Sequence, residues 1–144
     1  MLSNLAFTPV GHLVAAWLGI VLGLASGAVI GLWFHDDAWL GGYASWRRRM
    51  LRLGHISFFG LGLLNMAYAG TAPVAFMGDF VSQSPGLQAV LTGWGFIAGA
   101  VLMPTVCFLS AWHKPWRHAF VLPVACLLGA SVSVAVNLLL GVWS

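Results

Sequence analysis

The stretch that decides the fold runs from Pro9 to Phe34, PVGHLVAAWLGIVLGLASGAVIGLWF, and contains no Asp, Glu, Lys or Arg. A helix of about 26 residues is about 39 Å long, which exceeds the hydrocarbon core of a bilayer, about 30 Å thick. Thr8 is placed to cap this helix, and Pro9 fits a first helical turn, where its missing N–H costs nothing. The sequence therefore predicts a transmembrane helix near its start.

Three further apolar stretches predict helices near residues 47–69, 86–112 and 117–142, with a loop at 70–85. The 144 residues are 60% hydrophobic and only 6% charged, whereas about a quarter of the residues in a soluble domain are charged. So few polar groups cannot cover a water-exposed surface. We predict one all-α domain, a bundle of four transmembrane helices.

The basic residues predict the orientation in the membrane. They lie at two links between helices: Arg47, Arg48, Arg49 and Arg52 at the first, and Lys114 and Arg117 at the last. Four spans place these two links on the same side, and the positive-inside rule assigns that side to the cytoplasm. We therefore predict a multi-pass protein of the bacterial inner membrane with both termini outside. The bases form no stripe that would bind nucleic acid.

Small residues recur along the helices and predict close helix packing. Gly19, Gly23, Gly27 and Gly31 are spaced four residues apart in the first helix, and Gly95 and Gly99 have the same spacing in the third. The fourth helix carries Ala125, Gly129 and Ser133. These stripes either pack within the bundle or receive a helix of another membrane subunit, and the sequence does not select between the two.

Histidines near the basic links are candidate ligands of a b-type haem. His55 and His118 are predicted at similar depth on different helices, with His35 and His113 as substitutes. Neutral imidazoles that face each other across a helix bundle can bind haem iron. The alternative is that these histidines are interfacial polar residues that contact lipid phosphates.

A second polar set is predicted at comparable depth near the outer ends of the helices. It consists of His12, Asn65, Gln88, Thr92 and Asn137. Polar side chains within a membrane tend to face the bundle and bond one another. The functional alternative is a pocket for a quinone or a lipid headgroup, in which His12 bonds a carbonyl oxygen and Asn65 and Asn137 line the wall.

The chain offers little chemistry of its own. Asp36, Asp37 and Asp79 all fall in predicted loops, and no C-x-x-C or H-E-x-x-H pattern occurs. We expect an accessory subunit without catalytic activity, with bound lipids, in a larger complex that transfers electrons in respiration or photosynthesis. The alternative is a small b-type cytochrome or quinone-binding redox protein. A channel or carrier comes third, because proton coupling usually uses a carboxylate within a span.

Overall fold

The computed structural model describes residues 8–82 and 84–142 and is built almost entirely from helices. The four long helices are α2 (Pro9–Leu32), α3 (Trp46–Ala75), α5 (Leu87–Trp112) and α6 (Val121–Val142). The short elements are α4 (Met77–Ser82) and the 3-10 helices η1 (Trp39–Gly41) and η2 (Lys114–Phe120). Each long helix, α6 together with η2, is long and apolar enough to cross a membrane. The prediction of four such helices is confirmed.

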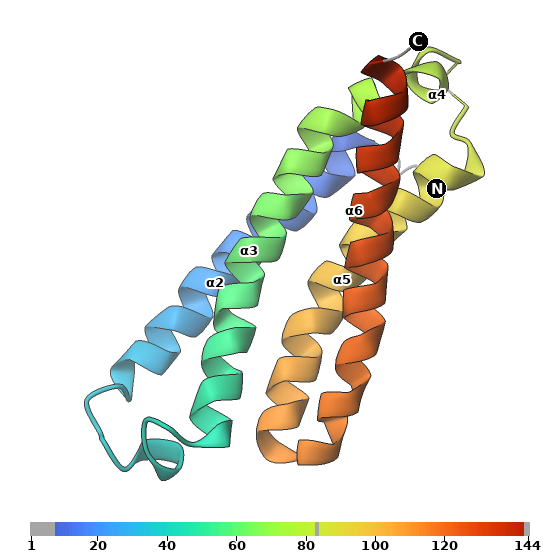
Figure 1. Cartoon of the computed structure of the whole chain (residues 1–144). Coiled ribbons are helices and arrows are strands. Elements are labelled where there is room, and N and C mark those ends of the chain that lie inside the picture. Colours follow the sequence, from blue (N-terminus) through green and yellow to red (C-terminus); the bar gives the residue numbers. More distant parts are fainter. Residues whose placement is uncertain (1–7, 83, 143–144) are drawn as a thin grey trace.

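The long helices form two antiparallel hairpins, α2 with α3 and α5 with α6 (Figure 1). α2 packs mainly on α3, α3 on α5, and α5 on α6, so the helices follow one another in a row. The buried share of each helix's most apolar stretch differs between the helices. It is 39% in α5 but only 11% in α2 and 11% in α6. α3 and α5 therefore form the centre, and α2 and α6 are the edges.

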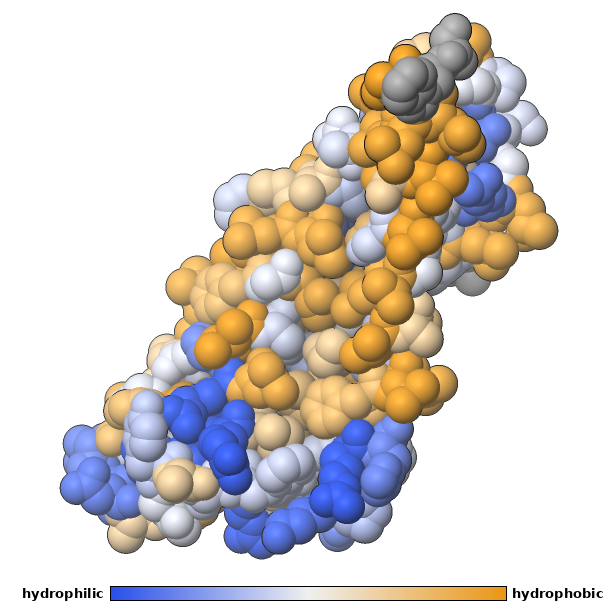
Figure 2. All heavy atoms as spheres, in the orientation of Figure 1, coloured by the Kyte–Doolittle hydropathy of each residue, from blue (hydrophilic) through white to orange (hydrophobic). Residues whose placement is uncertain are grey.

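Both links that carry the basic residues lie at one end of the molecule, while α2 starts and α6 ends at the other (Figure 1). We call the end that holds residues 33–49 and 113–118 the basic end. Hydrophilic residues gather there, and hydrophobic ones cover the visible face of α6 (Figure 2). The predicted grouping of the links thus agrees with the fold. The predicted N-terminal segment lies mostly outside the described residues, which begin at Thr8.

α3 is longer than the sequence predicted. The expected loop at 70–85 is largely helical, because α3 continues to Ala75 and α4 follows almost at once. Pro73 lies within α3 and removes one backbone hydrogen bond. The helix persists because Ala72 and Ala75 pack in the main core cluster with Tyr68, at 1%, 8% and 3% exposure. Burial against α5 and α6 outweighs the two helix-breaking residues, Gly70 and Pro73.

α6 begins later than predicted. Residues 114–120 form the 3-10 helix η2, and α-helical geometry starts at Val121 instead of near 117. Pro123 explains the boundary, because it has no N–H to donate to the carbonyl four residues earlier. It therefore lies in the first turn of α6, where a helix leaves N–H groups unpaired in any case.

The closest helix contact joins α2 to α3 and depends on glycine. A Cβ built on Gly19 would lie 2.9 Å from the Phe58 carbonyl oxygen and 3.4 Å from the Gly62 Cα. A Cβ on Gly23 would lie 2.7 Å from the Phe59 ring, and one on Gly27 would lie 2.6 Å from His55. The glycine stripe of α2 is therefore filled by α3 of the same chain, except at the last position. Gly31 has nothing within 4 Å.

The glycines of α5 pack against α6. A Cβ on Gly95 would lie 2.9 Å from the Ala130 Cβ and 3.0 Å from the Cys126 carbonyl oxygen, and one on Gly99 would meet the Leu127 side chain. The small-residue positions predicted as partner contacts are thus mostly engaged within the chain. A partner at these stripes stays a prediction, and Gly31 has the open space for it.

Candidate functional site

Two polar residues of the predicted outer set, His12 and Asn65, form a buried pair between α2 and α3. Both are 0% exposed, and His12 Nδ1 lies 2.8 Å from Asn65 Oδ1. Asn65 Nδ2 donates to the Leu61 carbonyl oxygen at 2.9 Å, so its Oδ1 is the acceptor. His12 therefore carries its proton on Nδ1 and donates it to Asn65.

Aromatic rings surround this pair and connect it to α5. The Tyr68 ring lies edge-on to His12 at 4.5 Å and against Phe96 at 4.7 Å between ring centroids. Asn65 Nδ2 also reaches the Phe96 carbonyl oxygen at 3.5 Å. The Asn65 side-chain amide therefore connects α3 to both α2 and α5, as expected of interhelical polar contacts in a membrane. The predicted quinone contact at His12 would have to use Nε2, because Nδ1 is bonded to Asn65.

The remaining members of the outer set meet at a different place, between α5 and α6. Gln88 Nε2 donates to Ser133 Oγ at 3.2 Å, and the hydroxyl oxygens of Thr92 and Ser133 lie 2.8 Å apart. Asn137 Nδ2 donates to the Ser133 carbonyl oxygen at 2.8 Å. The five residues predicted at one depth thus separate into two clusters. A single pocket shared by His12, Asn65 and Asn137 stays a prediction without a contact between its halves.

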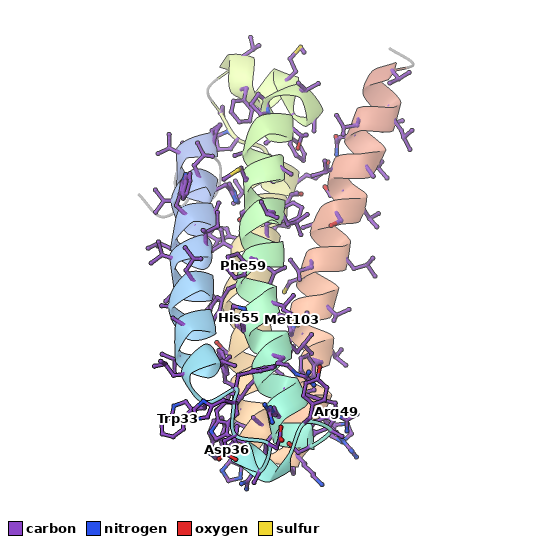
Figure 3. The ribbon with its side chains drawn as sticks, turned by 90° about the vertical axis from the view of Figure 1, so that its left-hand side faces the viewer. Trp33, Asp36, Arg49, His55, Phe59 and Met103 are labelled. Carbon is purple, nitrogen blue, oxygen red and sulfur yellow. The ribbon has the colours of Figure 1, made fainter. Side chains whose placement is uncertain are left out.

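His55 turns toward α2. Its Nδ1 lies 3.1 Å from Ser26 Oγ, and its ring is edge-on to Phe59 at 5.4 Å between centroids. The Cε1 edge of the ring points at Gly27, and Figure 3 shows His55 and Phe59 between the two helices. The sequence did not identify Ser26, because a serine in an apolar run carries no signal of which helix face it occupies.

The other histidines predicted as haem ligands lie at the surface of the basic end. His118 is exposed in η2, where its Nε2 accepts from Arg117 Nε at 3.3 Å. His35 and His113 are also exposed. The structure shows no contact between His55 and His118, so haem ligation stays a prediction. Between Thr8 and Val142, residue 83 excepted, no group of three or more His, Cys, Asp and Glu forms a metal-binding cluster.

Arg48 occupies a position that the sequence did not predict. Arginines at the end of a transmembrane helix usually extend toward lipid headgroups, but Arg48 is only 2% exposed. Its Nη2 donates to the Phe34 carbonyl oxygen at 3.1 Å, and its Nη1 donates to the Asp36 carbonyl oxygen at 3.4 Å. Its Nε is buried without a hydrogen-bond partner. The guanidinium therefore anchors the loop between α2 and α3 from inside.

Three aromatic rings of that loop enclose the guanidinium. The Arg48 Cζ lies 4.9 Å from the Phe34 ring centroid, 5.5 Å from Tyr43 and 5.6 Å from Trp39. Each distance falls within the range of a cation–π interaction. The chain wraps around Arg48 through three successive residues with positive φ, namely Leu40 at 57°, Gly41 at 87° and Gly42 at 90°. The two glycines adopt this backbone without strain.

These contacts fix helices and a loop in place, and none of them is a recognised catalytic arrangement. Ser26 and His55 lie within hydrogen-bond distance, but Ser26 also donates to the Gly23 carbonyl oxygen of its own helix at 3.1 Å. A serine within a helix has no neighbouring free backbone N–H groups to stabilise an oxyanion. Comparison with known proteins finds no match among family models, curated proteins or solved structures.

Proposed function

We propose that this chain is an accessory, structural transmembrane subunit of a larger complex in the bacterial inner membrane. The exposure of α6 carries the proposal, because only 11% of its most apolar stretch is buried. The buried polar groups also support a structural role, since His12 and Asn65 bond each other across the contact between α2 and α3. An electron-transfer assembly, respiratory or photosynthetic, is the setting that we propose for it.

The open side of α6 is the surface where a partner helix would pack. A groove of about 730 Å³ between α5 and α6 is lined by Trp94, Gly95, Gly129 and Ser133, among others. Gly129 has nothing within 4 Å, so another backbone can approach it closely. With Ala125 and Ser133 on the same helix, it offers the small-residue spacing that transmembrane helices use to associate.

Gentle extraction tests this proposal. We expect native mass measurement in mild detergent to find the chain bound to other subunits, and Gly129→Leu to remove most of that association. Gly60→Leu is the matched control, because Gly60 also has nothing within 4 Å but lies on α3. A stable, monodisperse monomer from native membranes, with no other subunit, would refute the proposal.

We further propose that the basic end faces the cytoplasm. A cysteine at the exposed Ser84 should react with a membrane-impermeant maleimide in intact spheroplasts, whereas one at the exposed Ala44 should react only after lysis. Ala44 is preferable to its neighbour Ser45, whose side chain accepts a hydrogen bond from the Arg48 N–H. The unmodified chain, with Cys107 buried and Cys126 partly buried, measures the background. Labelling in the reverse order would invert the orientation.

A further inference from the structure

Two grooves lie end to end where α2 and α5 border α3. The groove nearer the basic end has a volume of about 440 Å³ and is lined by Ala25, Val29, Phe58 and three tryptophans, Trp33, Trp39 and Trp112, among others. We call it the tryptophan groove. The second groove, of about 600 Å³, shares Leu22, Phe58 and Phe108 with the first. The Phe58 and Phe108 rings, 6.0 Å apart, mark the junction.

The length of the tryptophan groove matches one leaflet of a bilayer. Along α2 it extends from Leu22 to Trp33, the residue that follows the last helical residue, Leu32. At 1.5 Å per residue this distance is about 16 Å, and half of a hydrocarbon core is about 15 Å. An acyl chain of one lipid is therefore of the right length.

The open end of the groove carries the residues of a membrane–water boundary. Trp33 is 54% exposed and Trp112 is 56% exposed, and tryptophan favours the level of the lipid headgroups. Trp39 completes this rim, and its ring lies 5.6 Å from the buried Arg48 guanidinium. The groove thus has an apolar interior, an aromatic rim and a fixed positive charge behind the rim.

The charge of the residues around the tryptophan groove favours a lipid with an anionic headgroup. Five of the six Lys and Arg residues belong to the basic end, whose acidic residues are Asp36 and Asp37. The sixth, Arg52, reaches this end through its hydrogen bond to the Tyr43 carbonyl oxygen. Arg48 makes its polar contacts with backbone carbonyl oxygens, so its charge adds to the local potential. Basic residues next to a membrane attract anionic lipids. The 600 Å³ groove lies farther from this charge, toward Gly11.

We infer that the tryptophan groove is a binding site for one anionic phospholipid. One of its acyl chains lies between α2 and α5 on Phe58, and its phosphate lies beyond the tryptophan rim among the bases. This site does not depend on membership of a complex, because every residue that builds it belongs to one chain. It is a bound lipid of defined position.

Native mass spectrometry tests the site with defined lipids. After delipidation, equal amounts of phosphatidylglycerol and phosphatidylcholine with the same chains are added to the purified protein. We expect one retained phosphatidylglycerol, favoured at least about fivefold over phosphatidylcholine, the effect of one basic residue near a membrane. Diacylglycerol, which has the chains without the phosphate, should not be retained. Equal retention of all three lipids would overturn the role assigned to charge.

A matched pair of variants tests whether the lipid binds in the tryptophan groove. Ala25→Trp fills the groove and should abolish retention, whereas Ala28→Trp should not, because both alanines are exposed on α2 but only Ala25 lines the groove. Retention by both variants would overturn the site. If Ala25→Trp fails to fold, tryptophan fluorescence of the unmodified chain tests the lipid site instead. In phosphatidylcholine vesicles, a few per cent of brominated phosphatidylglycerol should quench it more than brominated phosphatidylcholine does, and equal quenching would contradict the site.

Discussion

Replacing Gly62 by leucine should separate α2 from α3. A Cβ at Gly62 would lie 2.9 Å from the Ala16 carbonyl oxygen, and backbone atoms cannot move aside as a flexible side chain can. Overpacking a tight contact costs about 1–3 kcal/mol, and we expect the upper end of that range. Thermal unfolding in detergent, followed by reaction of the buried Cys107 thiol with a fluorogenic maleimide, should show a much lower midpoint.

Gly60→Leu is the control for this substitution. Gly60 lies in the same helix, two residues earlier, and has nothing within 4 Å. The same leucine there should leave the unfolding midpoint nearly unchanged. If the two variants unfold at the same temperature, the close approach of α2 and α3 is not the contact that holds the first hairpin together.

Arg48→Met should release the loop between α2 and α3. The substitution keeps the unbranched apolar stem but removes the Arg48 donors from the Phe34 and Asp36 carbonyl oxygens. A hydrogen bond to a charged group contributes about 1.5–3 kcal/mol, and the cation–π contacts add to it. Hydrogen–deuterium exchange should show faster exchange of residues 33–45, with the long helices much less affected. Lysine at this position should restore only part of the protection, because it lacks the planar fork of donors.

Arg49→Met supplies the comparison. Arg49 is the next residue and is exposed, and Figure 3 shows it at the basic end. Its loss removes the same charge from the same helical turn without touching the aromatic enclosure. Exchange in the loop should stay as in the unmodified chain. Equal acceleration in both variants would mean that net charge, and not the enclosed guanidinium, holds the loop.

Much of the fold follows from residue pattern alone. Long apolar runs in a chain with few charges predict helices that are long and apolar enough to cross a membrane, and the predicted start of the first helix at Pro9 is confirmed. The position of the basic residues at two alternate links places them at one end of any four-span chain. These features depend on composition and spacing, which a sequence displays directly.

The departures come from tertiary contacts that local pattern does not encode. Gly70 and Pro73 predict the end of a helix, yet burial of Ala72 and Ala75 carries α3 past them. The burial of Arg48 depends on how the loop folds back over it.

The candidate site residues were likewise predicted only in part from the sequence. His12 and Asn65 were predicted at one depth, but depth does not reveal which helix faces meet. Only packing of α2 against α3 brings Ser26 to His55.

The row of helices also bears on how the chain is made. Each long helix has its main contact with the long helix synthesised just before it, α3 with α2, α5 with α3, and α6 with α5. A helix that leaves the insertion machinery therefore finds its principal neighbour already in the bilayer. Native contacts between segments close in sequence form with a small loss of chain entropy. Assembly can accordingly keep pace with translation, one helix at a time, and α6 joins α5 with its outer side still open.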